Sequence, residues 1–132
     1  MKKKVAILGS TGSIGKQTFE IIKKDKKNFD VVLLSTNNNV KEITKQIREL
    51  KPKNLVINNR NHYIKLKKKF KSVNIFNSFH VFFKKFDKKI DYSISAISGL
   101  SGLQPTLDII KHTKNVAIAN KESIICAWNL IE

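Results

Sequence analysis

The chain has 132 residues, 41% of them hydrophobic, and a formal net charge of +16. This length suits one domain, residues 1–132, with a core of its own. No apolar stretch approaches the roughly 20 residues that a membrane span requires. The apolar run after the N-terminal lysines is also too short for an export signal. We therefore expect a cytoplasmic protein without a membrane partner, and Cys126, the only cysteine, excludes an internal disulfide.

The first strand is expected at residues 5–8, a continuous apolar run. Residues 9–15 then read G-S-T-G-S-I-G, with glycines at a spacing of three. Glycine permits a tight turn and a close approach of phosphate to the backbone. The helix that follows points its unpaired N–H groups at an anion, and Thr11 and Ser13 add hydroxyl donors. The segment predicts a phosphate or dinucleotide site at Gly12, and the alternative is a plain turn between strand and helix.

A helical face is expected from the apolar spacing of Ile14, Thr18, Ile21 and Ile22. The second strand is expected at residues 29–34. The following segment contains Asn37, Asn38 and Asn39 and no acidic residue. Domains that prefer NADH usually carry an Asp or Glu there, which would repel a 2′-phosphate. Amide donors favour NADPH instead, although asparagine is also a common turn residue.

The middle of the chain continues the alternation of strands and helices. A helix over residues 40–50 is ended by Pro52, and strands are expected at residues 55–57 and 73–76. Ser78 is expected to start a short helix with a phenylalanine stripe that faces the core and binds no ligand. That stripe consists of Phe79, Phe82, Phe83 and Phe86.

The last third carries a second glycine-rich turn, with Gly99 and Gly102 after a strand at residues 92–97. The next helix is expected to bury Leu103, Leu107 and Ile110. A strand at residues 116–119 leads into A-N-K-E-S at residues 119–123, which contains Asn120, Lys121 and Glu122. These side chains could contact a cofactor and an anionic substrate at the end of a strand. Asn and Glu also suit an ordinary helix start, and spacing alone does not separate the two interpretations.

This alternation indicates an α/β fold, a Rossmann-like, doubly wound, mostly parallel sheet with helices on both faces. No histidine spacing suits a metal, and no catalytic residue is predicted. The net charge leaves an alternative, a basic module that binds nucleic acid or other polyanions. However, 24 of the 26 basic residues are lysines, whereas phosphate and base recognition favours arginine. We therefore favour solvated helix faces, and nucleic acid is not an expected partner.

Three segments together resemble the 1-deoxy-D-xylulose 5-phosphate reductoisomerases. They are V-A-I-L-G-S-T-G-S-I-G at residues 5–15, S-G-L-S-G-L-Q-P-T at residues 98–106, and A-N-K-E-S at residues 119–123. They occur in the family's order and at about its spacing, so the resemblance covers the whole chain. It implies an NADPH-dependent enzyme that uses Mg²⁺ or Mn²⁺. Such enzymes rearrange and reduce 1-deoxy-D-xylulose 5-phosphate to 2-C-methyl-D-erythritol 4-phosphate in non-mevalonate isoprenoid synthesis.

The resemblance also implies roles for single residues. Lys121 would bind the phosphosugar substrate. The cofactor-binding residues would be Thr11, Gly12, Ser13, Ile14, Asn37, Asn38, Asn39, Asn120 and Glu122. The family commonly has glycine at the position of Asn37. The family's acidic metal ligands follow the A-N-K-E-S helix, so we expect this chain alone, ending at Glu132, to lack turnover. Full-length members of the family are homodimers.

Overall fold

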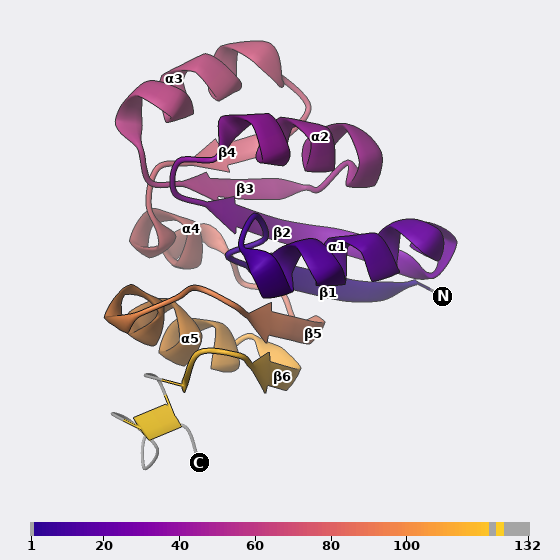
Figure 1. The fold of residues 1–132 in the computed structure, drawn as a ribbon, viewed down its shortest axis with the longest axis vertical. Helices are drawn as coiled ribbons and strands as arrows, with labels where there is room; N and C mark the ends of the chain where they lie inside the picture. The colour runs from indigo at the N-terminus through magenta and orange to yellow at the C-terminus, as the bar shows by residue number, and fades with distance from the viewer. Residues whose placement is uncertain (1, 122–123, 126–132) are drawn as a thin grey trace.

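A computed structural model describes residues 2–121 and 124–125 of the chain. A six-stranded parallel sheet has the order β4-β3-β2-β1-β5-β6 (Figure 1). The strands are β1 (Lys3–Leu8), β2 (Phe29–Thr36), β3 (Asn54–Ile57), β4 (Asn74–Phe76), β5 (Ile90–Ser95) and β6 (Thr113–Ile118). The helices are α1 (Ser13–Lys24), α2 (Val40–Leu50), α3 (Arg60–Lys69), α4 (Phe79–Lys85) and α5 (Leu103–Ile110), with 3-10 turns η1 (Lys26–Asn28) and η2 (Leu100–Gly102). The Rossmann-like fold is confirmed.

The helices divide between two hydrophobic cores, one on each face of the sheet. Ile22 of α1, Ile43 of α2 and Leu66 of α3 share one core with the strands. Phe82 of α4 and Ile109 of α5 belong to the other core. The chain winds outward from β1 to β4 and then returns to β5 on the far side of β1. This reversal opens a crevice beyond the carboxyl ends of β1 and β5, where ligands of such sheets bind.

The expected buried face of α1 is wrong in part. Ile14 and Ile21 are 45% and 66% exposed, whereas Gly15, Phe19 and Ile22 are buried. Counting apolar side chains overlooked the glycine, which has no side chain and lets α1 approach the preceding turn. The helix is therefore rotated so that Gly15 meets the backbone of Gly9 and Ser10.

The expected face of α5 is also wrong, because Leu103, Leu107 and Ile110 are only half-buried. The buried residues are Pro105, Thr106 and Ile109. Thr106 tolerates burial because its hydroxyl bonds to the Gly102 carbonyl, at 2.6 Å, and to the Ser95 hydroxyl. Thr106 is therefore buried on α5 although it is polar, because its hydrogen bonds are satisfied. The apolar spacing predicted only apolar residues on this face.

Three other local predictions are confirmed, at the end of α2, at the start of α4 and at the phenylalanine stripe. Helix α2 ends at Leu50, before Pro52, and Lys51 adopts the left-handed conformation with a φ of 47°. Ser78 caps α4, since its Oγ accepts a hydrogen bond from the Val81 N–H at 3.2 Å. The phenylalanine stripe of α4 does face the core. Strand β5 lies two residues earlier than expected, at Ile90–Ser95, because buried Ser93 and Ser95 interrupt the apolar pattern.

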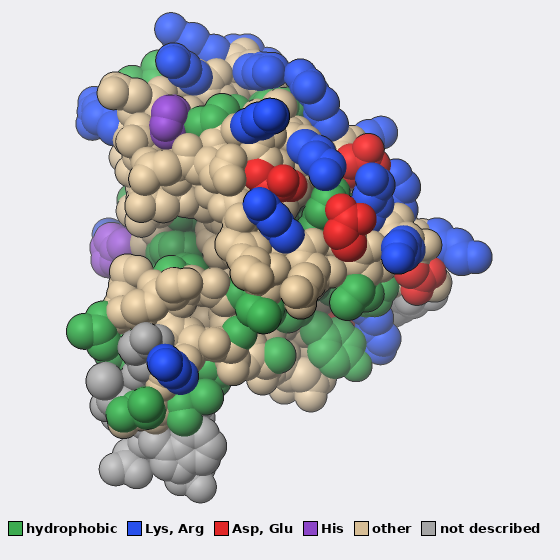
Figure 2. All heavy atoms as spheres, viewed as in Figure 1, with side chains coloured by type: hydrophobic (Ala, Val, Ile, Leu, Met, Phe, Trp, Pro, Cys, Tyr) green, Lys and Arg blue, Asp and Glu red, His purple; other side chains and the backbone are tan. Residues whose placement is uncertain are grey.

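The positive charge is spread over the surface. Figure 2 shows basic side chains scattered over the face formed by α1, α2 and α3, with acidic side chains among them. The lysines of α3 are solvent-exposed. In the described residues, Asp30 pairs with Lys53 at 3.0 Å, Asp91 with Lys114 at 3.4 Å and Glu49 with Lys26 at 3.7 Å. No helix in residues 2–121 and 124–125 is long and apolar enough to cross a membrane.

Candidate functional site

A groove of about 280 Å³ lies beyond the carboxyl ends of β1, β2 and β5, where the strand order reverses. Its lining residues come from five connections in the sequence: Gly9, Thr11, Gly12, Ser35, Thr36, Asn37, Asn58, Phe79, Ala96, Ile97, Ser98, Ser101 and Pro105. A larger hollow of about 670 Å³ lies at the free edge of β4, between α3 and α4. We take the smaller groove as the site because a helix N-terminus and the crevice of the sheet both open on it.

The turn between β1 and α1 presents backbone donors to this groove. Gly9 has a φ of 77°, and the Gly12 N–H donates to the Gly9 carbonyl at 3.3 Å. The first helical bond runs from the Lys16 N–H to the Gly12 carbonyl at 2.8 Å. The N–H groups of Ser13, Ile14 and Gly15 therefore have no partner within the helix. Since no side chain caps α1 at Gly12, these groups are available to an anion.

The space above Gly12 is open. A Cβ atom built there would meet only the carbonyl oxygens of Gly9 and Ala96, at 3.7 and 3.9 Å, which are ordinary contacts. A phosphate group can thus approach the helix end without displacing protein atoms. The geometry agrees with the predicted role of residues 11–14, although ligand contacts of these residues remain a proposal.

Hydrogen bonds attach the turn to the end of β2. The Gly9 N–H donates to Ser35 Oγ at 2.8 Å, and the Ser10 N–H donates to the Ser35 carbonyl at 2.9 Å. The hydroxyls of Thr11 and Thr36 lie 2.7 Å apart and share a hydrogen bond. The turn is therefore held in place before any ligand arrives, which reduces the ordering that binding requires.

The three asparagines after β2 are exposed but differ in their contacts. Asn37 lines the groove. Asn38 Oδ1 accepts a hydrogen bond from Asn59 Nδ2 at 3.1 Å. Asn39 caps α2, since its Oδ1 accepts from the Glu42 N–H at 3.1 Å. The structure therefore places Asn37 beside Gly12, while the side chain of Asn39 acts as an ordinary helix cap.

The structure describes residues 119–121 of the A-N-K-E-S segment. Asn120 is 3% exposed, and its Nδ2 donates to the carbonyls of Ile97 and, at 2.9 Å, of Gly99. It braces the loop after β5 and is absent from the lining of the groove. Lys121 is exposed. Glu122 lies outside the described residues, so its predicted cofactor contact is not placed.

Asn58 and Phe79 are among the lining residues that the sequence analysis did not assign to the site. Asn58 follows the last residue of β3, and Phe79 begins α4 soon after β4. Phe79 was expected to be core only, yet it is partly buried and also lines the groove. Their position directly after a strand was the available signal, because all strands of a parallel sheet end at the same edge.

Ionisable groups contribute little to the groove. In the part of the chain that the structure describes, no three His, Cys, Asp or Glu side chains gather where they could hold a metal ion. The one clear pKa shift among the described groups concerns Asp91, at the opposite, amino-terminal end of β5. The Lys4 N–H, at 2.8 Å, holds the pKa of this carboxyl below its ordinary value, and Lys114 adds to the effect. The described residues that line the groove therefore offer backbone, hydroxyl and amide groups and no charged side chain.

Fold and groove together define a Rossmann-like, doubly wound α/β domain, with its crevice at the point where the strand order reverses. The family model described as 1-deoxy-D-xylulose 5-phosphate reductoisomerase matches residues 5–128. The chain therefore belongs to the 1-deoxy-D-xylulose 5-phosphate reductoisomerase family.

Relatives agree with this assignment. The enzyme of that name from Pelagibacter ubique is 52% identical over 134 residues, covering 98% of this chain and 34% of the relative. The enzyme from Thermoanaerobacter pseudethanolicus is 38% identical, covering 98% of this chain and 34% of the relative. A solved structure of the Zymomonas mobilis enzyme in complex with NADPH has a TM-score of 0.90 and 32% identity, over 99% of this chain and 35% of that chain. The chain thus spans about a third of the length of the relatives it matches.

Proposed function

We propose that residues 1–132 form the domain that binds NADPH, with the pyrophosphate on the N-terminus of α1. The observation that carries the proposal is the open, uncapped helix start at Gly12, at the point where the strand order reverses. The residues fit the cofactor, because N–H donors line the turn and no Asp or Glu is among the described residues that line the groove around Asn37. The NADPH complex of the Zymomonas mobilis relative supports the same cofactor.

The contacts proposed for single residues follow from the resemblance to the family. The backbone of Thr11, Gly12, Ser13 and Ile14 would hold the pyrophosphate and its neighbours. Asn37, Asn38 and Asn39 would receive the adenosine ribose and 2′-phosphate, Asn38 and Asn39 partly through their backbone because their side-chain oxygens are already bonded. Asn120 and Glu122 would approach the nicotinamide end, and Lys121 would bind a phosphosugar.

The activity of the whole protein is a wider proposal. We infer that it converts 1-deoxy-D-xylulose 5-phosphate to 2-C-methyl-D-erythritol 4-phosphate as a cytoplasmic homodimer. NADPH would supply the hydride, and this chain's residues would bind and orient it. A solved relative in complex with NADPH, fosmidomycin and magnesium has a TM-score of 0.87 and 28% identity. In residues 2–121 and 124–125, no three His, Cys, Asp or Glu side chains gather where they could hold a metal ion. The lack of turnover by residues 1–132 alone stays a prediction.

Titration calorimetry with NADPH and, in parallel, NADH tests the cofactor assignment. We expect saturable one-to-one binding that favours NADPH. Gly12→Asp should weaken it by about a hundredfold, because a carboxylate would occupy the phosphate position. The variant should still fold, since Gly12 already has the extended conformation of a cap and Asp is a good N-cap residue. Gly12→Asn is the matched control, with a similar shape and no charge, and it should lose less affinity.

A lack of binding to either nucleotide by a folded chain would contradict the cofactor proposal for these residues. The competing function, binding of polyanions through the net charge, predicts a steep salt dependence that Gly12→Asp leaves almost unchanged. Equal affinity for NADPH in Gly12→Asp and in the unaltered chain would therefore show that the N-terminus of α1 does not bind the cofactor.

A further inference from the structure

Gln46 is a buried polar residue in the middle of α2, with a side chain that is 0% exposed. Its Nε2 donates to the Ser10 carbonyl at 2.9 Å and to Glu42 Oε2 at 3.3 Å. Its Oε1 is buried and has no hydrogen-bond partner. Because Nε2 meets two acceptors, the orientation of the amide is well determined.

This arrangement is unfavourable for stability alone. An amide that buries an unpaired oxygen loses free energy compared with an apolar side chain of the same size. The neighbours of Gln46 on the same face of α2, Ile43 and Ile47, are apolar and fully packed. A glutamine at this position therefore suggests a use for its donor.

The donor acts on the turn that faces the groove. The carbonyl of Ser10 belongs to the same planar peptide unit as the N–H of Thr11, and the two point in opposite directions. Holding the carbonyl against α2 therefore aims the Thr11 N–H away from α2. Since Thr11 lines the groove, the orientation of this peptide unit decides how the turn presents its donors.

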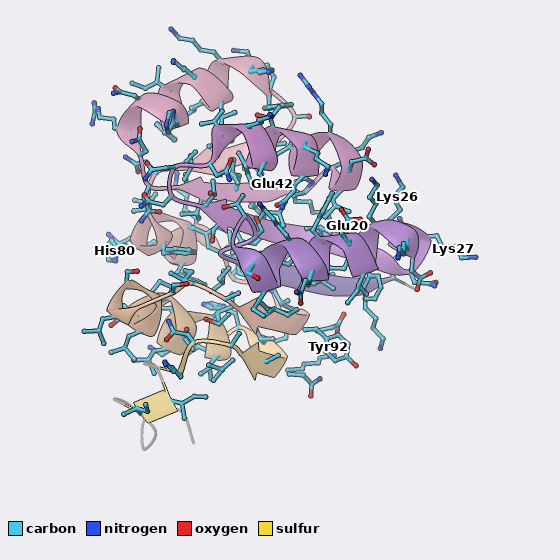
Figure 3. All side chains as sticks on the ribbon, in the orientation of Figure 1. Glu20, Lys26, Lys27, Glu42, His80 and Tyr92 are labelled. Carbon is cyan, nitrogen blue, oxygen red and sulfur yellow. The ribbon has the colours of Figure 1, made fainter. Side chains whose placement is uncertain are left out.

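The same side of α2 also reaches the asparagine loop. The Glu42 N–H is bonded to Asn39, and the Glu42 carboxylate accepts from Gln46. Figure 3 shows Glu42 on α2, on the side that faces α1. A short hydrogen-bonded path thus joins Asn39, Glu42, Gln46 and Ser10, and it connects the two loops that would hold the two phosphate-bearing parts of the cofactor.

We propose that Gln46 is a positioning residue, which sets the peptide unit between Ser10 and Thr11 in the orientation that the pyrophosphate requires. The effect on ligand affinity rests on the proposed NADPH function. The effect on the turn itself does not.

The test compares Gln46→Met with the same substitution at an exposed position, Gln17→Met on α1. Methionine keeps the length and volume of glutamine and removes the donor. Calorimetry well below the melting temperature should show NADPH binding about tenfold weaker in Gln46→Met, as expected for a lost hydrogen bond. Gln17→Met should bind as the unaltered chain does.

Amide hydrogen exchange, measured by NMR without nucleotide, separates positioning from a general structural role. We expect faster exchange at Ser10 and Gly12 in Gln46→Met, with little change at the strands. Faster exchange across the whole sheet would overturn the proposal, because it would show only reduced stability. So would unaltered exchange at the turn.

The two readouts fail separately. If the unaltered chain does not bind NADPH, the proposed function fails and the exchange at Ser10 and Gly12 still decides the role of Gln46. If Gln46→Met does not fold, Gln46→Leu provides a second apolar side chain for the same measurement. An unaltered NADPH affinity in a folded variant would overturn the positioning role.

Discussion

Two glycine-rich turns follow neighbouring strands of the sheet, one after β1 at residues 9–15 and one after β5 at residues 99–102. Both open with a glycine of nearly the same left-handed φ, 77° at Gly9 and 76° at Gly99. Both also contain a later glycine pressed against backbone, since a Cβ would lie 2.6 Å from Ser10 Cα at Gly15 and 2.7 Å from the Ile97 carbonyl at Gly102.

The turns differ in what surrounds them. A Cβ at Gly9 would lie 2.8 Å from the Ala96 carbonyl, whereas no atom of the described residues beyond its chain neighbours lies within 4 Å of a Cβ at Gly99. The first turn leads directly into the uncapped start of α1. The second passes through η2, and Asn120 donates to two of its neighbouring carbonyls. Similar glycine spacing thus builds one turn that presents donors and another that is braced from within.

Replacing Gly9 or Gly99 with alanine should lower the free energy of unfolding by different amounts in the two turns. Gly99→Ala introduces only backbone strain, which we expect to lower the free energy of unfolding by about 2 kcal/mol. Gly9→Ala adds a clash with the backbone of Ala96, for a total loss of about 4 kcal/mol. Urea unfolding followed by circular dichroism measures both. Equal losses in the two variants would show that contact between the turns is unimportant.

Gly15→Ala tests the contact between α1 and its own turn. Alanine favours a helix over glycine by roughly 1 kcal/mol. Here the new methyl group would overlap backbone atoms of Gly9 and Ser10, which cannot move aside as a flexible side chain can. Such overpacking costs about 3 kcal/mol. We expect a net loss of about 2 kcal/mol in the same unfolding experiment. The same substitution at a residue on the outer face of this helix, Gln17→Ala, should have little effect, and a stabilised Gly15→Ala would contradict the packing described.

The sequence predicted the position of both turns because glycine and hydroxyl residues directly follow short apolar runs. It also assigned residues of the first turn and Asn37 to one cofactor, and Gly12 and Asn37 both line the groove. It did not assign Asn58 or Phe79, although both follow strands of the sheet. It did not reveal Gln46, because the contact of this residue with the turn depends on the rotation of α2. Gln46 reaches a carbonyl 36 residues earlier in the chain.

Helix rotation was the weakest part of the prediction for a related reason. Apolar periodicity identifies large side chains, but the buried face of α1 includes Gly15 and that of α5 includes Thr106. A glycine that allows close approach and a threonine with satisfied hydrogen bonds both count as non-apolar in such patterns. The residues that determine the rotation of both helices were therefore ones that a search for apolar residues does not count.

Asp91 provides a control for the two turns, because it lies at the opposite, amino-terminal end of β5. It joins β5 to β1 through the Lys4 N–H, and its lowered pKa means that the folded chain holds the carboxylate more strongly than the unfolded chain does. This contribution is complete above the ordinary value of 3.8 and is lost as the pH falls through the lower pKa of the folded state. Asp91→Asn should therefore reduce stability slightly at neutral pH and make it less sensitive to acid below that value.

Urea midpoints from neutral pH down to pH 3 would show this as a flatter acid limb in Asp91→Asn. NADPH affinity should not change, because the residue lies at the amino-terminal end of β5 and the groove lies at the other. A loss of affinity in Asp91→Asn would mean that the strands β1 and β5 transmit strain along their length. In that case the difference between the two turns could not be assigned to their local contacts alone.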